Sequence, residues 1–194
     1  DRILHGPVVQ TQLVGQRREG VVVRVVDVGP HQGVVIGQII GNGFHVELDV
    51  EHRALMAIAI GDLGVANTST MAMAPLERGW TLYAHTPPAG TPITDCRDDD
   101  GAVERVWESL GSLHQCQISH GDLRGKEITI DEGTARFGGF GSAEYGATDE
   151  QLQADVAQLL VTTTDLYGAE AAVRAAVDVF GKDGVLRASR RLTK

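Results

Sequence analysis

Five features follow one another in the second half of the chain, and their order restricts the fold more than any other part of the sequence. A helix comes first, then the polar loop His120-Gly121-Asp122, a short hairpin, a Gly-Phe-Gly turn, and a helix that carries Asp155. Apolar residues recur every three or four positions in the first helix, which predicts one buried face: Val103, Val106, Trp107, Leu110 and Leu113. Such a helix must pack against other elements, so we expect this half to form one compact core.

Local signals fix the elements around the loop. Strands are predicted for 127–130 and 134–137, because Asp131-Glu132-Gly133 is typical of a hairpin turn. Thr148 and Gln151 have the spacing of a capping box, which predicts a helix start at Thr148.

The first half of the chain reads mainly as β structure. Strands are predicted for 7–14, 20–28, 66–73 and 80–85, with Met71 and Met73 filling the core. The apolar segment 31–42 is ambiguous and we interpret it as helical. A clearer helix is predicted for 49–60, with Asp49 as its N-cap.

A proline-rich stretch, 86–92, separates the two halves. We therefore expect an α+β chain of two lobes, 1–85 and 86–194.

Composition restricts the partners. Seventeen basic and 26 acidic residues give a formal charge of −9, which argues against nucleic acid as a partner. Two cysteines are too few for a disulfide framework, and the longest apolar run, 55–60, is too short for a membrane span. The C-terminal end is basic instead: Arg187, Arg190, Arg191 and Lys194. That cluster is typical of a solvated helix end or of a segment next to a membrane.

The run from His120 to Glu127, with the helix before it and the hairpin and Phe140-Gly141 after it, resembles the catalytic core of protein kinases. Through Gly121 it is similar to the aminoglycoside phosphotransferase-like branch. The resemblance implies a kinase-like fold with a β-rich N-lobe and a small helical C-lobe. It also implies that Asp122 is the base, that His120 is structural, and that Asp155 braces the loop.

The positions that bind metal in that family differ here. Glu127 stands where the family has a magnesium-binding Asn, and Gly139-Phe140-Gly141 replaces Asp-Phe-Gly, so one carboxylate is lost. Weak or absent binding of ATP and magnesium is therefore expected, with no metal site and no cofactor.

The nucleotide-binding positions differ as well. Arg24 replaces the strand lysine and would pair with Glu51, while Tyr83 would partly fill the nucleotide pocket. The glycine-rich phosphate loop is absent from the sequence.

From Val21 to Gly184 the chain is also similar to a bacterial kinase-like cytoplasmic domain fused ahead of a membrane region of the lysylphosphatidylglycerol-synthase or flippase type. This implies a pseudokinase on the cytoplasmic side of the inner membrane, as part of a membrane protein. Its partner would be its own transmembrane domain or another membrane or regulatory protein, with a small-molecule ligand as a further option. Membrane spans are then expected beyond Lys194.

Two alternatives stay open. One is an active, divergent ATP-dependent phosphotransferase that uses Asp122 as base and Glu127 or Glu144 as metal ligand. A second is a plain interaction domain. A zinc cluster of His114, Cys116, His120 and Asp122 is disfavoured, because the spacing does not match known zinc sites.

Overall fold

The computed structural model describes residues 11–13, 21–25, 35–40, 44–76, 80–99 and 101–192. Internal contacts divide the chain into two compact units. The N-terminal unit is Asp1–Leu55 with Thr68–Pro87, and the C-terminal unit is Met56–Asn67 with Pro88–Lys194. Helices and antiparallel sheets occur together, so the predicted α+β class is confirmed.

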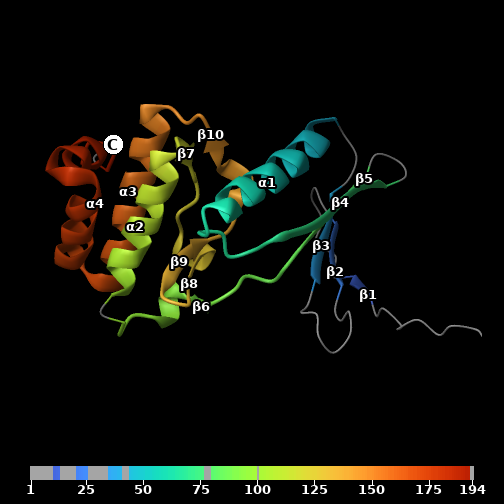
Figure 1. The fold of residues 1–194 in the computed structure, drawn as a ribbon, viewed down its shortest axis with the longest axis horizontal. Coiled ribbons are helices and arrows are strands. Elements are labelled where there is room, and N and C mark those ends of the chain that lie inside the picture. Colours follow the sequence, from blue (N-terminus) through green and yellow to red (C-terminus); the bar gives the residue numbers. More distant parts are fainter. Residues whose placement is uncertain are drawn as a thin grey trace, which may run out of the picture. The chain divides into compact units, whose positions relative to one another are not determined.

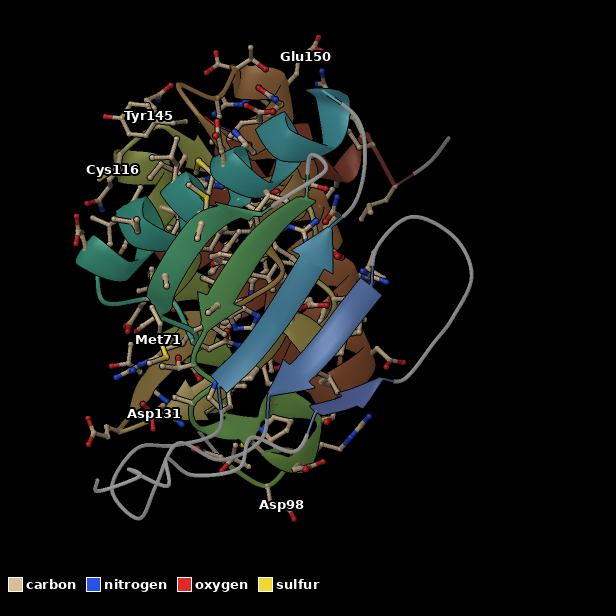
Figure 2. All side chains as sticks on the ribbon, turned by 90° about the vertical axis from the view of Figure 1, so that its right-hand side faces the viewer. Met71, Asp98, Cys116, Asp131, Tyr145 and Glu150 are labelled. Carbon is tan, nitrogen blue, oxygen red and sulfur yellow. The ribbon has the colours of Figure 1, made fainter. Side chains whose placement is uncertain are left out.

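The N-terminal unit contains a five-stranded antiparallel sheet with the order β1-β2-β3-β5-β4, whose strands lie side by side in Figure 2. Valine and isoleucine dominate β2 and β3, as suits β-branched side chains on a pleated surface. The strands are β1 (Thr11–Leu13), β2 (Val21–Val25), β3 (Val35–Ile40), β4 (Thr70–Leu76) and β5 (Trp80–His85).

Two predictions for this region are wrong. The segment predicted as helical contains β3, which pairs with β2 on one side and with β5 on the other. The partner β5 is distant in sequence, so local periodicity could not identify this pairing. Helix α1 (Phe44–Asp62) begins before the predicted N-cap, so Asp49 lies inside it.

Met71 and Met73 were expected in the core, but both are exposed, at 51% and 45%. They lie on β4, the edge strand of the sheet, and Met71 projects at the surface in Figure 2. Tyr83 is buried instead, in a small core with Val50 and Ala54. The Tyr83 hydroxyl lies 3.1 Å from the Thr70 hydroxyl.

Three helices form the body of the C-terminal unit and lie side by side in Figure 1. They are α2 (Ala102–Gln115), α3 (Asp149–Tyr167) and α4 (Ala169–Ser189), the last with a non-helical break at Gly181. The short strands are β6 (Thr91–Pro92), β7 (Ile118–Ser119), β8 (Ile128–Asp131), β9 (Thr134–Phe137) and β10 (Glu144–Tyr145). Among the described residues, none of the helices combines the length and the apolar composition that a membrane span requires.

The predicted apolar face of α2 is confirmed, because all five of its residues are buried. Trp107 is fully buried, and its ring meets that of Phe180 on α4 edge to face at 6.0 Å. Burying this stripe against α4 and β9 gives the unit its main core.

Two local predictions are also confirmed. The hairpin β8–β9 closes with a two-residue loop, since Asp131 pairs with Thr134 and both Glu132 and Gly133 have positive φ. Thr148 and Gln151 form the expected capping box at the start of α3.

Candidate functional site

The candidate loop, residues 120–127, joins β7 to β8 within the C-terminal unit. A row of polar side chains on α3 holds it. Asp155 accepts hydrogen bonds from the backbone N–H groups of His120 at 2.6 Å and Gly121 at 2.8 Å. Because Asp155 is fully buried, these two bonds satisfy a carboxylate that would otherwise be costly to bury.

Gln158 and Thr162 continue this row along α3. Gln158 Oε1 accepts from the backbone N–H of Leu123 at 3.1 Å, and the Thr162 hydroxyl donates to the Leu123 carbonyl at 2.6 Å. Positions 155, 158 and 162 lie on one face of the helix by their spacing of three and four. The row therefore fixes the backbone of the loop from residue 120 to residue 123.

His120 is fully buried beneath the loop. Its Nδ1 accepts a hydrogen bond from the backbone N–H of Asp122 at 3.2 Å, and its ring packs between those of Phe137 and Phe140. Burial lowers the pKa of His120 below its ordinary value of 6.5, and the Asp155 carboxylate offsets this only in part. The imidazole is thus held neutral, as a structural support for the backbone on either side of Gly121.

Gly121 has a positive φ of 77°, which few other residues adopt. A Cβ at this position would also lie 2.5 Å from the carbonyl oxygen of Ser142. The loop and the turn after Gly139 therefore approach each other too closely for any side chain at residue 121.

Asp122 carries the carboxylate that the sequence singles out, and it lies at the surface of the loop. Both of its oxygens accept hydrogen bonds from the guanidinium of Arg124, which holds the pKa of Asp122 below its usual 3.8. A carboxylate so engaged is a weak base, and a substrate hydroxyl would have to compete with Arg124 for it.

Glu127 and Gly139 are in direct contact. Gly139 adopts the left-handed conformation, with φ of 73°, and a Cβ there would lie 2.7 Å from Glu127 Oε2. The Glu127 side chain thus occupies the space into which a side chain at residue 139 would project. The other carboxylate oxygen of Glu127 lies 3.1 Å from Lys126 Nζ.

The two residues after Gly139 differ in their surroundings. Phe140 is buried against His120, whereas Gly141 is exposed in a short 3-10 turn, Phe140–Ser142. The structure therefore brings together the predicted site residues of the C-terminal unit: His120, Asp122, Glu127, Gly139, Phe140, Gly141 and Asp155.

Three predicted site residues belong to the N-terminal unit: Arg24, Glu51 and Tyr83. The side chain of Arg24 lies outside the described residues, so its predicted pairing with Glu51 stays a prediction. Glu51 is exposed on α1, and Tyr83 is buried in the small core of its own unit.

The metal alternatives gain no support from the part of the chain that the structure describes, where no group of three or more His, Cys, Asp or Glu side chains could hold an ion. Cys116 points outward in Figure 2. The His114 side chain is mostly buried, and its Nε2 lies 3.3 Å from Asp155 Oδ2. His114 therefore belongs to the support of the loop.

Arg124, Gln158 and Thr162 are site residues that the sequence interpretation missed. Their signals were present: Arg124 is two residues from Asp122, and the other two repeat the helical spacing from Asp155. Polar side chains on the packed face of a helix need hydrogen-bond partners. A row of them therefore indicates that the helix bonds to the backbone of a neighbouring segment.

Comparison with known proteins gives a limited result. No family model matches the chain. It is similar over 67 residues, at 36% identity, to the probable bifunctional tRNA threonylcarbamoyladenosine biosynthesis protein of Methanothermobacter thermautotrophicus. The similarity covers 34% of this chain and 12% of that relative, so this chain matches only a small part of that protein.

Proposed function

We propose that the chain is a pseudokinase, a kinase-like domain with impaired catalysis, and that it acts as a cytoplasmic regulatory or partner-binding domain of a bacterial membrane protein. The contact between Glu127 and Gly139 is the observation that carries this proposal. Both positions bind magnesium in the family that the loop resembles. Here one has no side chain and the other fills the space left by it, so the pair is suited to packing rather than to binding a metal–phosphate complex.

The surroundings of Asp122 in the candidate loop support the same proposal. Arg124 engages both oxygens of Asp122, and the low pKa of that carboxyl disfavours proton acceptance near neutral pH. Asp155 and His120, by contrast, keep the hydrogen bonds that maintain the loop. The residues that hold the conformation of the loop are thus retained, whereas the features that phosphoryl transfer would require are lost.

ATP titration of the whole chain, followed by thermal shift with and without magnesium, tests the proposal. We expect no magnesium-dependent stabilisation at micromolar ATP. Turnover of radiolabelled ATP should give the same background for the chain and for Asp122→Ala. Magnesium-dependent stabilisation, or turnover that Asp122→Ala removes, would overturn the pseudokinase proposal.

A divergent but active phosphotransferase is the second candidate, and the observation that favours it is Asp122 itself, which is intact and partly accessible to solvent. In this case Glu127 would have to leave Gly139 and Lys126 to ligate a metal. The ATP turnover comparison distinguishes the two candidates.

The membrane part of the proposal has its own test. The basic residues Arg187, Arg190 and Arg191 lie at the end of α4, as expected for a segment that approaches an anionic membrane surface. The gene should therefore encode apolar spans of about 20 residues after Lys194. A stop codon shortly after Lys194 would contradict it.

A further inference from the structure

A pocket of about 510 Å³ lies within the C-terminal unit, on the side of the candidate loop that faces α3. We call it the loop–helix pocket. Its walls are residues 121–124 of the loop, one face of α3 between Ala154 and Thr162, and Arg191 with Leu192 after α4. Its volume falls within the usual range for small-molecule sites.

Apolar side chains make up one wall. Ala154, Ala157 and Val161 come from α3, and Leu192 faces them from the C-terminal turn. Val161 and Leu192 are 57% and 48% exposed, which leaves large apolar surfaces open to water at this pocket. An apolar group in the pocket would cover both, and this would favour its binding.

Charge at the pocket is positive, although the chain as a whole is acidic. Arg124 and Arg191 contribute two guanidinium groups and Asp122 one carboxylate, which leaves one net positive charge. Arg124 is already paired with Asp122. Arg191 has no acidic partner within the described residues, so its donors are available for an anion.

The remaining polar groups of the pocket are already used. Gln158 and Thr162 bind the backbone of Leu123, as described above. Specific recognition of a ligand therefore depends on the guanidinium groups.

From this combination we infer that the loop–helix pocket binds an amphiphilic anion, a single phosphate or carboxylate attached to a short apolar chain. The apolar part would lie against Val161 and Leu192, and the anionic head would lie at Arg191 and Arg124. The inference deepens the proposed function and rests on it, since it names the class of ligand that such a regulatory domain would sense. A lipid headgroup and a soluble metabolite share this chemistry.

Hexyl phosphate is a suitable soluble probe, titrated into the whole chain by isothermal calorimetry. We expect saturable binding with a Kd below about 1 mM, and much weaker binding of inorganic phosphate and of hexanol. Inorganic phosphate keeps only the anionic group, and hexanol keeps only the apolar chain. Absence of saturable binding by hexyl phosphate would overturn the inference.

Two variants locate the site. Arg191→Gln should weaken hexyl phosphate about tenfold by removing a charge-assisted hydrogen bond. Val161→Asp places a negative charge in the pocket, which should repel the anionic ligand and abolish binding. Since Val161 is exposed, the fold should tolerate this substitution. Arg187→Gln is the matched control, because it removes the same charge from an exposed residue on α4 that does not line the pocket. Equal weakening by both arginine variants would show a general charge effect and overturn the inference.

Vesicles distinguish the two sources of the anion. Binding to vesicles with anionic lipid, absent for neutral vesicles and lost in both Arg191→Gln and Val161→Asp, indicates a lipid headgroup in the pocket. Hexyl phosphate binding without such vesicle binding indicates a soluble anion.

The experiments also separate this inference from the proposed function. Failure of hexyl phosphate to bind leaves the ATP result, and hence the pseudokinase proposal, unchanged. Magnesium-dependent ATP turnover would instead remove the pseudokinase proposal, whatever the pocket binds.

Discussion

The candidate loop has two faces that differ in how their charged groups are satisfied. On the buried face, the Asp155 carboxylate is fully enclosed and accepts hydrogen bonds from the backbone of His120 and Gly121. On the open face, Asp122 and Glu127 pair with the exposed side chains of Arg124 and Lys126. Enclosed pairs that bond to backbone hold a conformation, whereas exposed pairs contribute little to stability and are screened by salt. The difference indicates that the loop keeps its shape independently of any chemistry at Asp122.

The largest effect should come from the buried face. Asp155→Ala leaves the buried N–H of His120 and the partly buried N–H of Gly121 without an acceptor, which should lower the free energy of unfolding by about 3–5 kcal/mol. Urea unfolding followed by circular dichroism measures this loss. Asp165→Ala, at an exposed position on the same helix, should change the free energy by less than about 0.5 kcal/mol. Similar small losses in both variants would contradict the assignment of loop support to Asp155.

A smaller effect should come from the contact between Glu127 and Gly139. Gly139→Ala adds a Cβ at a positive φ and against Glu127, while Gly146→Ala adds one at a positive φ of 72° with nothing within 4 Å. The positive φ alone should lower the free energy of unfolding by about 1–2 kcal/mol in either variant. The loss in Gly139→Ala should exceed the loss in Gly146→Ala by about 1 kcal/mol.

A double-mutant cycle isolates that excess. In a Glu127→Ala background the cost of Gly139→Ala should fall to that of Gly146→Ala, as read from urea midpoints. An unchanged difference would show that Glu127 does not fill the space beside residue 139.

The pH dependence of stability should report on His120. Its pKa is lower in the folded chain than its ordinary 6.5, so below that pH the unfolded chain binds more protons. The free energy of unfolding should therefore fall as the pH is lowered through 6.5. His120→Gln should remove part of this slope, measured by urea unfolding between about pH 5.5 and 7.5, above the ordinary range of carboxyl groups. Parallel curves for the chain and the variant would contradict a buried, neutral His120.

The smallest effect on stability should come from the open face. Arg124→Ala should leave the urea midpoint almost unchanged but raise the pKa of Asp122 toward its ordinary 3.8, since the Arg124 hydrogen bonds are the main cause of its lowering. Carbon-13 NMR titration of the Asp122 carboxyl measures that change. Lys126→Ala, which removes a weaker charge effect on the same carboxyl, is the control. Equal pKa changes in both variants would show that the pairing with Arg124 is not specific.

Sequence patterns identified the elements whose causes are local. The apolar spacing of α2, the turn at Glu132-Gly133 and the capping box at Thr148 depend on residues within a few positions of one another, and all three are present. The predictions that failed depend on tertiary pairing. Val35–Ile40 forms a strand between β2 and β5, the second of which is distant in sequence, and Met71 is exposed on β4, where the register shifts between Thr70 and Ala72.

For the site, the sequence by itself determined which groups are available: an aspartate at 122, a glutamate at 127 and no carboxylate at 139. Only the tertiary structure decided what those groups do. It places the Glu127 side chain against Gly139, Arg124 on Asp122, and Asp155 beneath the backbone of residues 120 and 121. The physical reason is that charge and side-chain identity are properties of single residues. Burial and hydrogen bonding instead depend on neighbours that, for Asp155, are more than thirty positions away along the chain.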